Sequence, residues 1–146
     1  MIYSMGDNSQ IKVRIDNDRH QAQRLMDEIM SKVEALGYDD HACFAIRLSL
    51  DEGLSNAINH GNANDPSKHV DVAYVVNNKE IRVSIADQGP GFKPSEVPDP
   101  TDDVNLERPC GRGVMLMKAY MSEVEYNRRG NQVTLVKKKS CKQPAG

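Results

Sequence analysis

The chain has 146 residues, 27% of them charged, and a formal net charge of −2. This length fits one domain with a sizeable core, and the weakly acidic balance argues against direct binding of nucleic acid or of an anionic membrane. No apolar run approaches the roughly 20 residues of a membrane-spanning helix. Three scattered cysteines without a CxxC pair favour a reducing, cytoplasmic location.

The N-terminal half predicts one strand and two helices. Residues 1–10 are polar and are expected to be a flexible N-terminus. Strict alternation of apolar and polar side chains over Ile11–Asp16 predicts a half-buried strand. Apolar residues then recur every three or four positions over Arg19–Leu36, which predicts a helix. A second helix is expected from near His41 to near Gly61.

A strand pair follows in the middle of the chain. Val70–Val76 and Glu80–Asp87 read as strands joined by an asparagine-rich turn, which is typical of a hairpin. Asp87 has the same parity as the apolar residues of its strand, so its carboxylate is predicted to point toward the apolar side. A carboxylate placed there needs a hydrogen-bond donor, and a ligand amine could provide one.

The C-terminal part begins with a long loop. Five of the seven prolines fall within Pro90–Pro109, and no periodicity survives there, which is typical of a functional or mobile loop. A helix is expected over Gly113–Met121. A closing hairpin is expected around Arg129–Asn131, with Val124, Tyr126, Val133 and Leu135 on its strands.

The order of these elements predicts an α+β fold. A mixed, mostly antiparallel sheet with helices on one face, forming a two-layer sandwich, accommodates them most economically. The domain is expected to span residues 11–139, with residues 140–146 as a flexible tail.

The most informative stretch is the end of the second predicted helix. At about 100° per residue, Glu52, Asn56 and Asn59 gather opposite an apolar stripe, with His60 at the margin. A solvated polar face would explain this pattern as well. The chemistry suggests a site, because Glu52 can take a proton and Asn56 offers a neutral oxygen to a hard cation such as Mg²⁺.

Two glycine turns follow further along the chain. Asp87-Gln88-Gly89-Pro90-Gly91-Phe92 comes directly after a strand, and its glycines permit close approach of the backbone to a ligand. Gly111-Arg112-Gly113 opens a predicted helix, where free N–H groups can bind phosphate. Each string alone is explained equally well by an ordinary turn or hinge. Neither matches GxxxxGK[ST] or GxGxxG, which argues against P-loop and Rossmann sites.

Taken in order, these strings resemble a known family. Glu52-x-x-x-Asn56-x-x-x-His60-Gly61, Asp87-x-Gly89-x-Gly91 and Gly111-x-Gly113 are similar to the N box and glycine boxes of the GHKL (Bergerat-fold) ATPases. Within that superfamily the chain resembles the anti-sigma-factor serine/threonine-protein kinases of bacterial partner-switching systems over nearly its whole length. The resemblance implies the Bergerat, or histidine kinase-like ATPase, fold.

The resemblance also implies roles for the matching residues. Glu52 would be the catalytic base that accepts the proton of a hydroxyl nucleophile, and Asn56 would hold Mg²⁺ against the phosphates of ATP. Asp87 would bind the adenine amino group. The other ATP-binding positions would be His60, Gly89, Gly91, Phe92, Gly111, Arg112, Gly113 and, as a looser match in a late strand near the adenine, Thr134.

The resemblance further implies partners. The phospho-acceptor would be an anti-anti-sigma (STAS-type) protein, the protein held in check would be a sigma factor, and a homodimer is expected. A catalytically silent, nucleotide-dependent binding regulator of the same fold is the alternative. A third hypothesis is an isolated ATPase module of a two-component or phosphatase system.

Overall fold

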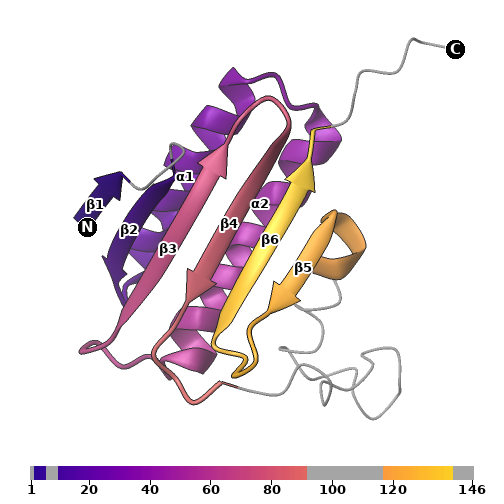
Figure 1. The fold of residues 1–146 in the computed structure, drawn as a ribbon. Coiled ribbons are helices and arrows are strands. Elements are labelled where there is room, and N and C mark those ends of the chain that lie inside the picture. The colour runs from indigo at the N-terminus through magenta and orange to yellow at the C-terminus, as the bar shows by residue number, and fades with distance from the viewer. Residues whose placement is uncertain (1, 6–9, 92–116, 140–146) are drawn as a thin grey trace, which may run out of the picture.

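The molecule is a two-layer α+β sandwich. Its structure, a computed structural model, describes residues 2–5, 10–91 and 117–139. One six-stranded sheet, in the order β1-β2-β3-β4-β6-β5, is covered by helices on one face (Figure 1). All described strand pairs are antiparallel. The predicted fold class is confirmed.

The helices and strands match the sequence-based boundaries closely from residue 11 onward. They are β1 (Ile2–Met5), β2 (Ile11–Asp16), α1 (Arg19–Ala35), α2 (Asp40–Ser55), the π-helix η2 (Asn56–Gly61), β3 (His69–Val76), β4 (Glu80–Ala86), β5 (Glu123–Tyr126) and β6 (Gln132–Lys138). Residues 117–120 form a further helical turn. The rest of the helix predicted over Gly113–Met121 falls partly outside the described residues.

Strand β1 lies within the N-terminal segment for which the sequence predicts no strand. It pairs antiparallel with β2, from Ile2 opposite Arg14 to Met5 opposite Ile11. A strand at the edge of a sheet is held mainly by main-chain hydrogen bonds to its single neighbour, and four residues are too few for a period-2 pattern to be visible. The sequence therefore carried little signal for β1.

Aspartates fix the starts of both long helices. The carboxylate of Asp18 accepts a hydrogen bond from the N–H of His20 at 3.0 Å, and Asp39 accepts one from Ala42 at 2.7 Å. Each caps a backbone donor that the first helical turn cannot satisfy, and such a cap contributes about 1 kcal/mol. The caps set where the apolar stripes of α1 and α2 begin to face the sheet.

The core lies between the helical layer and the inner face of the sheet. Its fully buried members come from both helices, from alternate positions of the strands and from the last helical turn: Ile15, Leu25, Ile29, Ile46, Leu50, Tyr74, Ile85, Met117 and Leu135. None of the described helices has the length and apolar character needed to cross a membrane.

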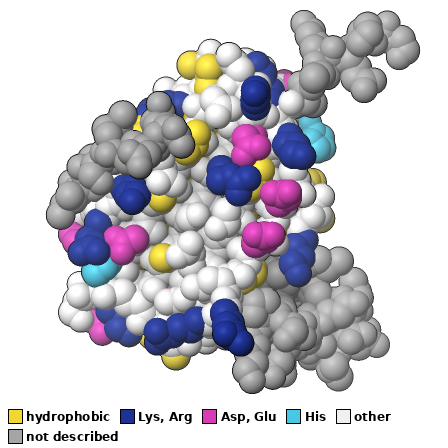
Figure 2. All heavy atoms as spheres, viewed as in Figure 1, with side chains coloured by type: hydrophobic (Ala, Val, Ile, Leu, Met, Phe, Trp, Pro, Cys, Tyr) yellow, Lys and Arg dark blue, Asp and Glu magenta, His cyan; other side chains and the backbone are white. Residues whose placement is uncertain are grey.

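The described helices all lie on one face of the sheet and leave the other face open (Figure 1). Figure 2, drawn in the same view as Figure 1, shows Lys and Arg side chains interspersed there with Asp and Glu. Arg14 and Asp71 form an ion pair at 2.8 Å, and Arg82 and Glu80 form one at 3.3 Å. These pairs are exposed, so each contributes little to stability.

Candidate functional site

Glu52 and Asn56 lie one turn apart where α2 passes into η2. The backbone N–H of Asn56 donates to the carbonyls of Glu52 and Gly53, so the Glu52 and Asn56 side chains share one side of the helix. Both side chains are half-buried. Burial raises the pKa of Glu52 above its ordinary value, and the nearby charge of Asp51 raises this pKa further. A carboxylate with a raised pKa binds a proton more readily than an ordinary one, which suits a general base.

The helix widens after Ser55, the last residue of α2. Residues Asn56–Gly61 form a π-helix, a local distortion that is frequent at functional sites. It ends where the N–H of Asn62 donates to the carbonyl of Ala57 at 2.8 Å. This segment carries Gly61 to the loop that follows β4, while the His60 side chain is exposed.

Gly61 and Gly89 form a tight cradle around Asp87. A Cβ atom at Gly61 would lie 2.2 Å from the Asp87 carboxylate, and a Cβ atom at Gly89 would lie 1.9 Å from the carbonyl oxygen of Gly61. Only glycine can occupy either position without movement of its surroundings. Because Gly61 belongs to the helical layer, the carboxylate of Asp87 lies on the helix side of the sheet, as the strand parity predicts.

The Asp87 carboxylate is held in place, but its hydrogen bond and the nearby positive charges only partly offset the cost of burying it. Its burial raises the pKa of Asp87. The N–H of Gly89 donates to Oδ1 of Asp87 at 2.8 Å, which opposes that rise, as do the positive charges of Lys68 and Arg129. The net effect remains a raised pKa. A half-buried carboxylate of this kind gains from a ligand that donates a hydrogen bond to it.

The turn between β5 and β6 also contacts the loop that follows β4. Gly91 has φ +81°, and a Cβ atom there would lie 1.9 Å from the carbonyl oxygen of Arg129. The backbone of Asp87 donates to the carbonyl of Asn131 at 2.9 Å, and the side-chain amide of Asn131 donates back to the carbonyl of Asp87 at 3.2 Å.

Two asparagines outside the sequence-based set therefore belong to this site. Asn62 accepts a hydrogen bond from the N–H of Gln88 at 2.7 Å, and Asn131 brackets Asp87 as described above. These contacts join residues far apart in the chain, so local patterns gave no signal for them. The position of Asn62 directly after Gly61 was the one available hint.

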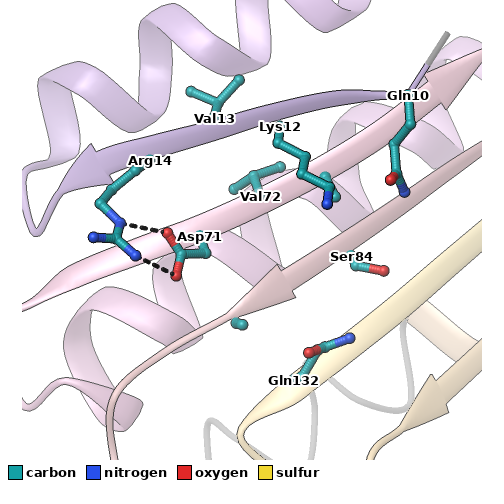
Figure 3. A pocket seen from close by; sticks show the side chains of 10 residues that line it. Gln10, Lys12, Val13, Arg14, Asp71, Val72, Ser84 and Gln132 are labelled. Carbon is teal, nitrogen blue, oxygen red and sulfur yellow. Dashed lines mark hydrogen bonds and ion pairs between the residues drawn. The ribbon is translucent and has the colours of Figure 1, made fainter. Parts of the chain in front are cut away.

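Thr134 is not brought to this cluster. Its hydroxyl lies 3.0 Å from that of Ser84, its partner in the β4–β6 register. Ser84 lines a groove of 590 Å³ on the sheet face that the helices leave open, together with Lys12, Arg14, Asp71 and Gln132 (Figure 3). The buried neighbours of Thr134, Val133 and Leu135, face the helices instead. Thr134 is thus on the opposite side of the sheet from the Asp87 carboxylate.

Four of the predicted ATP-binding residues cannot be placed. Phe92, Gly111, Arg112 and Gly113 lie outside the described residues. The described part of the site has two regions. Glu52 and Asn56 lie at the junction of α2 and η2, and the Asp87 cradle lies at the end of η2.

The described residues suit a nucleotide better than a metal held by protein alone. The Asp87 cradle offers a hydrogen-bond acceptor closely approached by backbone, which fits a purine amino group. Within the described ranges, no group of three or more His, Cys, Asp or Glu side chains could hold a metal ion. A Mg²⁺ ion would therefore need Asn56 together with phosphate oxygens and water, which is the usual environment of Mg²⁺ at nucleotide sites.

Comparison with known proteins decides the family. The sequence profile described as "Histidine kinase-like ATPase domain" matches residues 15–137. The chain belongs to the histidine kinase-like ATPase family. It falls within the anti-sigma kinase branch of this family, as the relatives below show, and membership implies that this ATPase domain binds ATP.

Curated relatives carry the names of kinases and anti-sigma factors. This ATPase domain is 31% identical over 101 residues to an anti-sigma F factor of Geobacillus stearothermophilus, which covers 66% of this chain and 68% of the relative. It is 22% identical over 109 residues to the serine-protein kinase RsbW of Oceanobacillus iheyensis, at 70% and 69% coverage. It is 28% identical over 96 residues to the serine/threonine-protein kinase BtrW of Bordetella bronchiseptica, at 63% and 68% coverage. The chain thus spans about two thirds of the length of these relatives.

A solved structure agrees with the fold. The RsbU and RsbW domains of a Mycobacterium tuberculosis protein match with a TM-score of 0.58 and 19% identity, covering 92% of this chain and 33% of that one. At this identity the match supports the histidine kinase-like ATPase fold alone.

Proposed function

We propose that this ATPase domain is an anti-sigma-factor kinase. It transfers the γ-phosphoryl group of ATP to a serine or threonine of an anti-anti-sigma (STAS-type) protein and sequesters a sigma factor when that partner is phosphorylated. The observation that carries the proposal is the placement of Glu52, with its raised pKa, one helical turn from Asn56, on the same helical segment whose last residue, Gly61, packs against Asp87.

The residues divide the work of phosphoryl transfer. Asp87 accepts a hydrogen bond from the adenine amino group and so fixes one end of the nucleotide. Glu52 accepts the proton of the attacking hydroxyl as that oxygen bonds to phosphorus and the bond to ADP breaks. Transfer of this kind depends mainly on positioning and charge neutralisation, so rigid binding of the adenine ring contributes a large part of catalysis.

Asn56 would hold the metal. Its side-chain oxygen would bind Mg²⁺, which neutralises charge on the phosphates. His60, exposed at the end of the same π-helix, is close enough in sequence to approach the nucleotide from that side. Phe92 and the Gly111-Arg112-Gly113 turn keep the roles that the family resemblance implies.

The names of the relatives support the choice of partners. Both "anti-sigma F factor" and "serine-protein kinase" occur among proteins similar to this chain. A protein that both phosphorylates and sequesters would combine these two names. We expect a homodimer acting in the cytoplasm, without direct contact to nucleic acid or membrane.

Phosphate transfer from labelled ATP tests the proposal. The wild-type chain is incubated with Mg²⁺ and with each anti-anti-sigma protein of its own organism, and the label should appear on a serine or threonine. Glu52→Gln should reduce the rate by roughly 10²–10⁴-fold. Glu34→Gln, which neutralises an exposed carboxylate of α1, is the matched control and should transfer at the wild-type rate.

Two outcomes would contradict the kinase assignment, and a third would contradict only the role of Glu52. Tight binding of ATP and partner without transfer points to the catalytically silent regulator. Acid-labile label on a histidine points to a two-component module. Undiminished transfer by Glu52→Gln removes Glu52 from the mechanism.

A further inference from the structure

Asn62 closes a ring of hydrogen bonds directly beside the proposed nucleotide site. Its side chain is fully buried, at 0% exposure. The amide oxygen accepts from the N–H of Gln88 at 2.7 Å, and the amide nitrogen donates to the carbonyl of His69 at 2.9 Å. The side chain of Gln88 in turn accepts from the N–H of His69 at 2.7 Å. The three residues thereby fix one another.

The remaining hydrogen of the Asn62 amide is also used. It is donated to the side-chain oxygen of Asn17, at 3.1 Å, in the segment between β2 and α1. Every polar atom of the Asn62 side chain thus has a partner, which determines the orientation of the amide. A fully satisfied buried amide rigidifies its surroundings, whereas loss of one partner leaves several groups unpaired.

The position of this ring relates it to Asp87. Asn62 follows Gly61, and Gln88 lies between Asp87 and Gly89. The bond from Gln88 to Asn62 therefore joins the two chain segments at the point where the Gly61 carbonyl, the Asp87 carboxylate and the Gly89 backbone come into contact. Among the described residues, this bond is a direct hydrogen bond between the loop after β4 and the residue that follows η2.

We propose that Asn62 is a positioning residue for base recognition: through Gln88 it sets the distance between Asp87 and the end of η2, and so determines the preference of the site for adenine. This inference rests on the proposed ATP site. It assigns to Asn62 an effect on nucleotide selectivity beyond a contribution to folding.

Two measurements test it, one of which needs no nucleotide. Amide hydrogen exchange of the unliganded protein reports directly on the Gln88 N–H. In Asn62→Ala this amide should exchange at least about tenfold faster, while the amides of Val83 and Ile85 in β4 keep wild-type rates. Calorimetric titration should show ATP binding weakened about tenfold and the ratio of ATP to GTP affinity reduced.

Two asparagine variants serve as controls. Asn17→Ala removes the bond to Asn62 and those to the carbonyls of Ile58 and Asp65, but it leaves the bond from Gln88 to Asn62. The melting temperature should fall while the ATP to GTP ratio stays as in the wild type. Asn77→Ala removes a side chain that caps the β3–β4 turn at the far end of the same strands, where it accepts from the N–H groups of Lys79 and Glu80. Its nucleotide affinities should not change.

Asn62→Asp covers the case in which the alanine variant does not fold, because burial favours the neutral carboxyl, which can still donate one hydrogen bond toward His69 or Asn17. It keeps the oxygen that accepts from Gln88, so the Gln88 amide should stay protected and the ATP to GTP ratio should be retained. An equal loss of selectivity in Asn17→Ala and Asn62→Ala, or lost selectivity in Asn62→Asp with Gln88 still protected, would overturn the proposal. Failure of the wild-type chain to bind ATP would instead overturn the proposed function and leave the exchange result standing.

Discussion

The carboxylate of Asp87 lies directly against the backbone of Gly61, in the space that a Cβ atom at position 61 would occupy. Such an atom would be 2.2 Å from Oδ2 of Asp87. The two residues are 26 positions apart and belong to different layers of the sandwich. Their contact makes Gly61 part of the nucleotide site rather than only the end of a helix.

Gly61→Ala should therefore impair ATP binding more than folding. The Asp87 side chain can rotate away from the new methyl group, but it then leaves the position in which it would meet adenine. We expect at least a tenfold loss of ATP affinity, about 1.4 kcal/mol, by calorimetric titration, with a small change in melting temperature. Gly53→Ala is the control, because its Cβ would meet side-chain ends of the core, Ile85 at 2.8 Å and Leu135 at 3.7 Å, and not Asp87, so ATP affinity should be kept.

Gly89→Ala should behave differently from Gly61→Ala. Its Cβ would lie 1.9 Å from the backbone oxygen of Gly61, so no side-chain rotation can relieve the contact. We expect both ATP affinity and melting temperature to fall. A Gly89→Ala protein with wild-type stability and affinity would contradict the close packing of these two segments.

Asp87→Asn should separate recognition from stability. Adenine offers an amino group to the carboxylate and guanine has none at that position, so ATP affinity should fall far more than GTP affinity. Asp71→Asn, on the open face of the sheet, should change neither affinity. Equal losses for ATP and GTP in Asp87→Asn would count against the adenine role.

The pH dependence of Asp87 gives a second expectation. Because burial raises its pKa in the folded protein, the unfolded chain loses this proton first as the pH rises, and the folded state loses stability between the ordinary and the raised pKa. Unliganded Asp87→Asn lacks this loss. The melting temperature of Asp87→Asn minus that of the wild type should therefore be larger at pH 7 than at pH 3.5.

The raised pKa of Glu52 predicts the acid limb of the kinase reaction. The ionised carboxylate is the base, so the transfer rate should fall as the pH drops through a pKa above the ordinary glutamate value. Because the charge of Asp51 contributes to that rise, Asp51→Asn should move the limb to lower pH. Rates of phosphate transfer over pH 4–8 measure this shift, and an unmoved limb would show that another group titrates.

Ser49 offers a stability prediction away from the site. Its hydroxyl is fully buried in α2 without a hydrogen-bond partner among the described residues. Ser49→Ala removes this unsatisfied group and should raise the free energy of unfolding by about 1 kcal/mol in denaturant titrations. Ser31→Ala, at an exposed position of α1, reports the helix-propensity part alone and should give a smaller gain. Equal gains in the two variants would show that the Ser49 hydroxyl is satisfied in solution.

Local periodicity was sufficient to predict most of the fold. The strands and helices from Ile11 onward bury one face each, so the alternation or the helical spacing of apolar residues marks their extent. The inward direction of Asp87 followed from the same parity. Strand β1 and the π-turn of η2 were not predicted, since the first is too short to show a pattern and the second depends on tertiary contacts.

The same parity rule could have placed Thr134 correctly. Val133 and Leu135 were assigned to the buried side of the last strand, which leaves Thr134 on the other side. Asn62 and Asn131 differ from this case, because their bonds span 26 and 44 residues and no local pattern encodes them.

The widened turn at Asn56–Gly61 has a consequence for chain length. In a regular α-helix each residue adds about 100° of rotation and 1.5 Å of rise. Deleting one residue between Ala57 and His60 would let the segment relax into an ordinary helix and remain folded. It would also swing Gly61 about a quarter of a turn around the axis, away from Asp87. Spacing in this segment is therefore as restrictive as the identity of its residues.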